Sequence, residues 1–118
     1  MILVDKDSGN VLAHDLEFAD SFWSRFRGLM LRRTFEDGEA LVFELPGPRK
    51  FGVHTFFVFF SIDLVYLDVD EKVVELKRDL SPWRAYSPEE EAGYLVELPA
   101  GKIEGAGVSV GDELQFLE

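Results

Sequence analysis

Residues 51–69, FGVHTFFVFFSIDLVYLDV, limit the possible folds more than any other part of the chain. Only His54, Asp63 and Asp68 in this stretch can carry charge, and Phe, Val and Ile occupy successive positions instead of alternating with polar residues. An apolar run of this kind predicts strands that are buried on both faces. We therefore expect two successive buried strands here, at the centre of a mainly β fold.

The segments on either side predict further strands. Turn residues separate two short apolar segments at 2–4 and 11–13, which predicts a hairpin, and residues 62–80 predict a second one. A strand over 40–45 should end at Pro46. Further strands are expected over 94–98 and 112–117, with a short helix over 102–106. Residues 81–92 hold two prolines and an acidic run, so we expect a loop with one helical turn at 88–92.

One amphipathic helix is expected at about residues 20–28. Phe18, Phe22, Phe26 and Leu29 recur at spacings of four, four and three, which places them on one helical face. Gly28 is a typical residue for the end of such a helix. The expected architecture is an antiparallel β-sandwich or jelly-roll-like barrel with this helix and short helical turns, in one domain of residues 1–118.

Arginines gather near the expected end of that helix, at Arg25, Arg27, Arg32 and Arg33. This basic cluster is a candidate site for an anionic ligand. The same arginines could instead form surface ion pairs with the many carboxylates of the chain, which is the more common situation. Both readings stay open, and Arg27 and Arg32 are retained as candidate binding residues.

Asp63 is a second candidate because its sequence neighbours are almost all apolar. A carboxylate that is buried without a partner is costly, so Asp63 requires backbone amides, an arginine such as Arg27 or Arg32, or His54. A carboxylate that holds a turn in place is the favoured interpretation, and a catalytic pair of Asp63 with His54 is the alternative.

The composition restricts the possible partners. The formal net charge is −11, with most of the acidic residues in the C-terminal half, which argues against binding to nucleic acid or to an anionic membrane. The chain has no cysteine and two histidines far apart in sequence, so we predict no metal site and no cofactor. The first ten residues are too acidic for a signal peptide, and the longest apolar run is far shorter than the about 20 residues that a bilayer requires. A cytoplasmic protein is expected.

Several motifs together resemble domain-of-unknown-function family 192 (DUF192), in an archaeal-type branch. They are RGLMLRR at 27–33, GEALVFELP at 38–46, VHTFFVFFSIDLVYLD at 53–68, KVVEL at 72–76 and YLVELPAGKIEGAGVSVGDELQF at 94–116. The resemblance covers most of the chain in the same order. It implies a small β-sandwich of jelly-roll type with one helix across an end, and it implies no agreed activity.

Three functional hypotheses follow. The first is a module that binds a small molecule or a protein segment, with His54, Asp63, Arg27, Arg32 and Glu97 as candidate binding residues. The second is a hydrolase or isomerase that uses Asp63 with His54 in one cleft. The third is a structural or assembly protein whose partner contacts either the loop with Trp83 and Tyr86 or an exposed sheet edge. The two aromatic residues form either a lid over the core or an exposed aromatic pair. The sequence indicates neither the oligomeric state nor the ligand.

Overall fold

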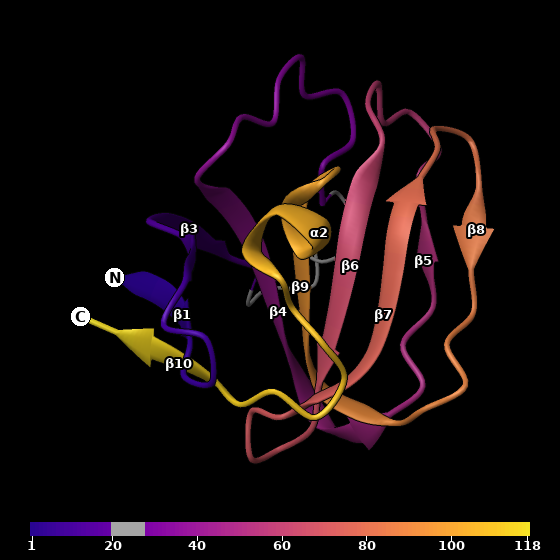
Figure 1. The fold of residues 1–118 in the computed structure, drawn as a ribbon. Coiled ribbons are helices and arrows are strands. Elements are labelled where there is room, and N and C mark those ends of the chain that lie inside the picture. The colour runs from indigo at the N-terminus through magenta and orange to yellow at the C-terminus, as the bar shows by residue number, and fades with distance from the viewer. Residues whose placement is uncertain (20–27) are drawn as a thin grey trace.

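The computed structural model describes residues 1–19 and 28–118, and the fold in these ranges is mainly β (Figure 1). The amphipathic helix expected at about 20–28 falls on residues 20–27 and so lies outside the described residues. In the described part the sheets form a sandwich-like arrangement and do not close into a barrel, which agrees with the predicted fold class.

The largest sheet has five strands in the order β3-β4-β9-β6-β7. These strands are β3 (Asp15–Phe18), β4 (Glu39–Arg49), β9 (Ala92–Pro99), β6 (Ile62–Leu67) and β7 (Val73–Leu80). The pairing of β3 with β4 is parallel and the other pairings are antiparallel. The sheet is therefore mixed, with one parallel pairing in a mostly antiparallel arrangement.

A three-stranded antiparallel sheet brings the two ends of the chain together (Figure 1). Its order is β10-β1-β2, with β1 (Ile2–Asp5), β2 (Val11–Ala13) and β10 (Leu114–Leu117). The pairing of β1 with β2 confirms the hairpin predicted at the start of the chain. The short helix α2 (Lys102–Ala106) precedes β10 and confirms the helix predicted over 102–106.

The middle of the five-stranded sheet is buried on both faces, and every residue of β6 is buried. On one face, Val65 and Leu67 belong to a core that also contains residues of the three-stranded sheet and of α2. On the other face, Leu64 and Tyr66 belong to a second core that includes Leu29. Burial on both faces explains why β6 carries apolar side chains at successive positions.

Only the second half of the Phe-rich stretch is a buried strand, so the prediction of two successive buried strands was wrong. The first half contains the two-residue strand β5 (Val53–His54), which pairs with β8 (Ala85–Tyr86). After β5 the buried Thr55 hydroxyl donates to the Ser81 carbonyl oxygen at 2.6 Å and accepts from the Arg84 amide at 2.8 Å. These bonds fix a turn, and Phe56, Phe57 and Phe59 after it are exposed.

Two smaller expectations were also wrong. Strand β4 does not end at Pro46 but continues to Arg49, with a register shift against β9 between Glu44 and Arg49. An irregular strand tolerates proline because not every residue there has to donate to its neighbour. The helical turn expected at 88–92 is absent: the Glu89 and Glu90 amides donate to the Glu75 carboxylate, and strand β9 already begins at Ala92.

Asp63 of β6 connects three elements through backbone hydrogen bonds. Its Oδ1 accepts from the Asp79 amide at 2.9 Å, at the end of β7. Its Oδ2 accepts from the Gly101 amide at 3.1 Å and from the Ile103 amide at 2.9 Å, at the start of α2. Gly101 has a φ of 94°, a left-handed conformation that glycine adopts without strain.

None of the helices in the described ranges is long and apolar enough to span a bilayer.

Replacing Asp63 with asparagine should destabilise the protein by about 3 kcal/mol, because an amide group cannot accept from all three N–H donors and its NH2 would face one of them. Urea denaturation at neutral pH measures the loss. The matched control is Asp79→Asn, since the Asp79 side chain is exposed. Equal stability of the two variants would show that the three bonds to Asp63 contribute little.

Candidate functional site

Glu97 lies in the middle of the five-stranded sheet, on its central strand β9. Its register partners are Leu41 on β4 and Leu64 on β6, so the carboxyl group stands between two leucines on one face of the sheet. Only 5 % of the residue is exposed. Within residues 1–19 and 28–118, the Glu97 carboxyl group has neither a hydrogen-bond partner nor an ion-pair partner.

Burial raises the pKa of Glu97 from its ordinary value of 4.5 to about 8. The cause is desolvation, since an apolar environment disfavours the charged carboxylate. At neutral pH the protonated form therefore predominates. A carboxyl group in this state can both donate and accept a hydrogen bond, and a cation that enters the site would favour its ionisation.

A cavity of about 60 Å³ opens beside Glu97. Its lining is mostly apolar and comes from the segment at 28–30 and from β4, β5, β6 and the turn after β5. The residues that line it are Gly28, Leu29, Met30, Phe43, Phe51, Gly52, Val53, His54, Val58, Ile62 and Glu97. The cavity therefore combines one buried carboxyl group and one imidazole with an apolar wall.

His54 belongs to β5 and is exposed. Its Nδ1 accepts a hydrogen bond from the Phe56 amide at 3.3 Å, and its ring stacks on the Phe56 ring with a centroid distance of 5.1 Å. A neutral imidazole that accepts at Nδ1 carries its proton on Nε2. His54 thus offers one hydrogen-bond donor next to the cavity.

Large apolar side chains surround the chain segments that form this cavity, and they are unusually exposed. We call this group the aromatic patch; it consists of Leu31, Phe56, Phe57, Phe59 and Trp83. The exposed fractions range from 44 % at Phe56 to 67 % at Leu31. A group of exposed apolar side chains of this size is typical of a binding surface.

The backbone of the aromatic patch is strained at three places. Leu31, Phe57 and Trp83 have φ values of 64°, 61° and 60°, a region that bulky residues rarely adopt. The Leu31 amide donates to the Phe57 carbonyl oxygen at 2.8 Å, and the Trp83 ring meets the Phe57 ring edge-on at 4.8 Å. Strain of this kind concentrates at functional sites, where the surrounding structure holds it in place.

The structure brings His54 and Glu97 together at one cavity but separates Asp63 from them. Asp63 faces the opposite side of the sheet, is 1 % exposed, and accepts three backbone hydrogen bonds. The enzymatic alternative required Asp63 and His54 in one cleft that solvent can reach. That condition is not met, and the interpretation of Asp63 as a carboxylate that holds a turn agrees with its contacts.

Arg32, the candidate arginine that the structure describes, does not join His54 and Glu97. Arg32 pairs with Glu17 at 3.3 Å and with Glu39 at 3.0 Å, so it links β3 to β4. Arg27 lies outside the described residues. The bonds of Arg32 agree with surface ion pairing, the second of the two readings of the basic cluster.

Sequence reasoning missed most of the aromatic patch. Of its members, only Trp83 was singled out, as one of two aromatic residues in a loop. Its companion Tyr86 is half-buried and donates a hydrogen bond to the Glu75 carboxylate, so the two do not form an exposed pair. The sequence feature that could have indicated the patch is the run of phenylalanines before Ser61. It has phenylalanines at both strand parities and is longer than one buried strand requires.

Comparison with known proteins gives consistent results. The family model DUF192, described as "Uncharacterized ACR", matches residues 3–116. A UPF0127 protein of Thermococcus sibiricus is 41 % identical over 117 residues, which cover 98 % of this chain and 74 % of that protein. A UPF0127 protein of Pyrococcus furiosus is 37 % identical over 116 residues, or 97 % of either chain.

Two solved structures share the fold. A protein of unknown function from Novosphingobium aromaticivorans has a TM-score of 0.87 and 19 % identity, over 98 % of this chain and 83 % of that one. A protein from Sinorhizobium meliloti, described as a candidate transcription regulator, has a TM-score of 0.85 and 24 % identity, over 97 % and 89 % of the two chains. At these identities the likeness concerns the fold alone.

Replacing Glu97 with glutamine should stabilise the protein at neutral and alkaline pH. The folded-state pKa of Glu97 is raised above its unfolded value of 4.5, so the wild type loses stability as pH rises from about 4.5 through 8. The variant avoids this loss, so its free energy of unfolding at pH 7 should exceed that of the wild type by on the order of 3 kcal/mol. Urea denaturation between pH 4 and pH 9 measures both proteins.

The matched control for this prediction is Glu44→Gln, a glutamate of β4 that is exposed. The gap between Glu97→Gln and wild type should close below pH 4.5, where both side chains are neutral. Stabilities that run parallel across the whole pH range would contradict a raised pKa at Glu97.

Proposed function

The chain belongs to the DUF192 family, and we propose that it acts as a binding module for a small organic amine. In this proposal the ammonium group enters the cavity beside Glu97, and the apolar body of the ligand lies on the aromatic patch. His54 donates a hydrogen bond from Nε2 to a polar atom of the ligand. The observation that carries the proposal is a buried carboxyl group that faces an apolar cavity at a sheet centre.

The position of Glu97 supports a cationic ligand. A carboxyl group between Leu41 and Leu64 destabilises the fold whenever it ionises. An ammonium ion in contact with it offsets that cost, because an opposite charge nearby favours the ionised form. A leucine at this position would pack without any such cost, so the carboxyl group is better explained by binding than by stability.

The size of the cavity supports a compact head group. Its volume of about 60 Å³ is far below the roughly 300 Å³ at which pockets for whole drug-sized ligands begin. It exceeds the about 15 Å³ that one water molecule requires, so an ammonium group with one or two attached carbons fits. The remainder of the ligand has to lie outside, where the aromatic patch begins.

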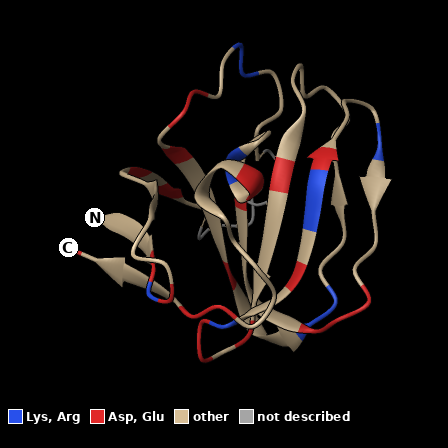
Figure 2. Ribbon diagram, viewed as in Figure 1, with Lys and Arg blue, Asp and Glu red and all other residues tan. Residues whose placement is uncertain are grey.

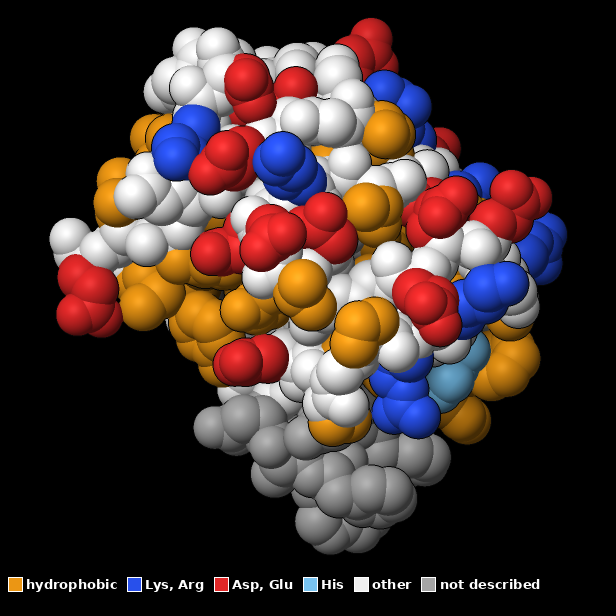
Figure 3. Space-filling view, turned by 90° about the horizontal axis from the view of Figure 1, so that it is seen from below, with side chains coloured by type: hydrophobic (Ala, Val, Ile, Leu, Met, Phe, Trp, Pro, Cys, Tyr) orange, Lys and Arg blue, Asp and Glu red, His pale blue; other side chains and the backbone are white. Residues whose placement is uncertain are grey.

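The charge of the molecule also favours a cation over an anion. The formal net charge is −11, and acidic residues occupy many loops (Figure 2), although on the face seen from below they are interspersed with basic side chains (Figure 3). A surrounding negative potential raises the local concentration of cations. The aromatic faces of Trp83 and the phenylalanines add cation–π and apolar attraction for an alkyl- or arylammonium ion.

We further infer that residues 1–118 act as one domain in the cytoplasm, as the sequence predicts. Expression of this chain and cell fractionation test this inference.

The assembly hypothesis keeps one supporting observation, since a second copy of the chain could also cover the aromatic patch. Light scattering at increasing protein concentration separates the two cases, because a binding module for small amines should stay monomeric.

The test of the proposed function is calorimetric titration with benzylamine and butylamine, with benzyl alcohol as the uncharged control. Binding requires ionised Glu97, whose pKa is about 8, so the association constant should rise on the order of fifty-fold from pH 6 to pH 8. The amines stay protonated over this range. Glu97→Gln should abolish the pH dependence and most of the affinity, whereas Glu44→Gln should leave both unchanged.

A second variant separates the aromatic patch from the cavity. Trp83→Ser should weaken benzylamine about tenfold and butylamine less, because the aryl group loses its contact surface. The proposal fails if neither amine binds at pH 8, or if Glu97→Gln binds as tightly as the wild type. Binding of benzyl alcohol as tight as that of benzylamine would also refute a cation site.

A further inference from the structure

Three aspartates from the two ends of the chain meet at one edge of the three-stranded sheet. Asp5 ends β1, Asp7 lies in the turn that follows, and Asp112 lies shortly before β10. One carboxylate oxygen of each lies within 4.8 Å of those of the other two. Acidic residues are concentrated in the loops of this region (Figure 2).

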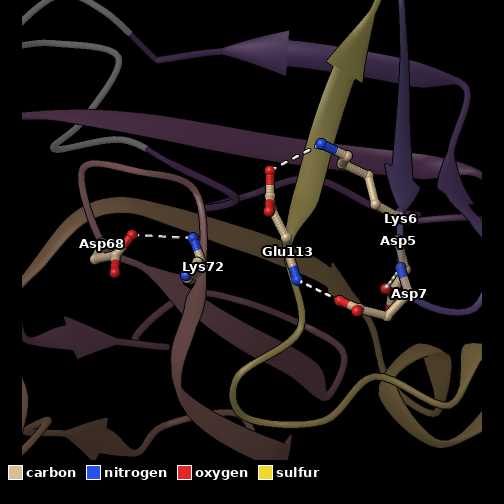
Figure 4. A network of polar contacts seen from close by, with 6 residues as sticks. All are labelled: Asp5, Lys6, Asp7, Asp68, Lys72 and Glu113. Carbon is tan, nitrogen blue, oxygen red and sulfur yellow. Dashed lines mark hydrogen bonds and ion pairs between the residues drawn. The ribbon is translucent and has the colours of Figure 1, made fainter.

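Backbone amides hold each of the three carboxylates by a single oxygen. Asp5 Oδ1 accepts from the Asp7 amide at 2.9 Å, and Asp7 Oδ2 accepts from the Glu113 amide at 2.7 Å (Figure 4). Asp112 Oδ2 accepts from the Ser109 amide at 2.9 Å. The carboxylates are thereby oriented in advance, and each keeps a second oxygen for another partner.

The second carboxylate oxygen of Asp5 indicates a ligand independently of the clustering of the three aspartates. Asp5 is 0 % exposed, and its Oδ2 is buried without a hydrogen-bond partner in the part of the chain that the structure describes. Burial and the adjacent Asp112 carboxylate raise the pKa of Asp5. Buried polar atoms nearly always have a partner, so an orphaned carboxylate oxygen between other carboxylates calls for one.

No basic side chain in residues 1–19 and 28–118 forms an ion pair with these three aspartates. Lys6 lies between Asp5 and Asp7 in sequence, but its Nζ binds Glu113 Oε2 at 2.9 Å (Figure 4). Lys6 and Asp7 thus contact the side chain and the backbone of the same residue. Lys6 therefore forms no direct ion pair with the three aspartates, and its raised pKa is due first to Glu113 and only to a lesser extent to the charge of Asp7.

We propose that Asp5, Asp7 and Asp112 bind a calcium ion. Carboxylate oxygens are ligands of hard divalent cations, and calcium accepts irregular arrangements of six to eight oxygens, whereas magnesium demands near-ideal octahedral geometry. Asp7 is exposed and Asp112 half-buried, so water has access to complete the coordination. The ion joins the end of β1, the turn after it and the segment before β10, and thereby fastens both ends of the chain.

The experiment is calorimetric titration of the full chain with calcium chloride, and separately with magnesium chloride, after removal of metals with a chelator. We expect one calcium ion per chain, weaker binding of magnesium, and a melting temperature that rises with calcium and falls again with chelator. Asp7→Asn and Asp112→Asn should each weaken calcium binding at least tenfold. Asparagine keeps an oxygen to accept the backbone amide, so both variants should fold.

The matched control is Asp70→Asn, an exposed aspartate of the β6–β7 turn, which should leave calcium binding unchanged. Absence of one-to-one binding, or equal binding by all variants, overturns the proposal. If Asp5→Asn or Asp112→Asn raises the melting temperature without calcium, and the wild type does not respond to calcium, the two carboxyl groups share a proton instead. Calcium binding should be the same in Glu97→Gln, which separates this site from the cavity.

Discussion

The middle of the five-stranded sheet is buried on both faces, so water is excluded from the side chains of β6 and from most of those of β9, and this constraint governs the molecule. Two carboxyl groups lie on adjacent strands of that sheet, on opposite faces. Asp63 accepts three backbone hydrogen bonds from the ends of β7 and the start of α2, so its charge is part of the architecture. Glu97 has no such amides in the described part of the chain and faces a cavity. The same burial therefore makes one carboxyl group a structural connection and the other a candidate for binding.

The fold was predictable wherever a segment has a single way to bury its apolar side chains. Ile62 to Leu67 has apolar residues on both faces and a turn after it, so the β6–β7 hairpin follows directly. The preceding segment at 56–59 is as apolar as β6 but does not form a buried strand, because the Thr55 hydroxyl binds two backbone groups of a loop some thirty residues later. A contact between residues so distant in sequence cannot be read from local pattern, and it turns Phe56, Phe57 and Phe59 outward.

The candidate site was predictable only in part, for a related reason. His54 and Glu97 were both candidates, but their meeting at one cavity depends on which face of β9 is turned toward β5. Asp63 attracted attention through its apolar neighbours, yet a carboxylate among apolar residues is equally consistent with a structural role, and only its partners distinguish the two. The aromatic patch was missed because exposed and buried phenylalanines are alike in sequence. The left-handed backbone at Leu31, Phe57 and Trp83 is visible only in three dimensions.

Asp5 presents the same physical problem as Asp63 and Glu97, but neither of their solutions fits it. It is as buried as Asp63, yet it accepts one backbone amide instead of three and its other oxygen has no partner among the described residues. Protonation, the state that predominates in Glu97 at neutral pH, would let Asp5 share a hydrogen with only one neighbouring carboxylate. Three carboxylates meet here, and a proton bridges two oxygens at most. A divalent cation contacts all three at once, and it neutralises more of their combined charge than a single proton does.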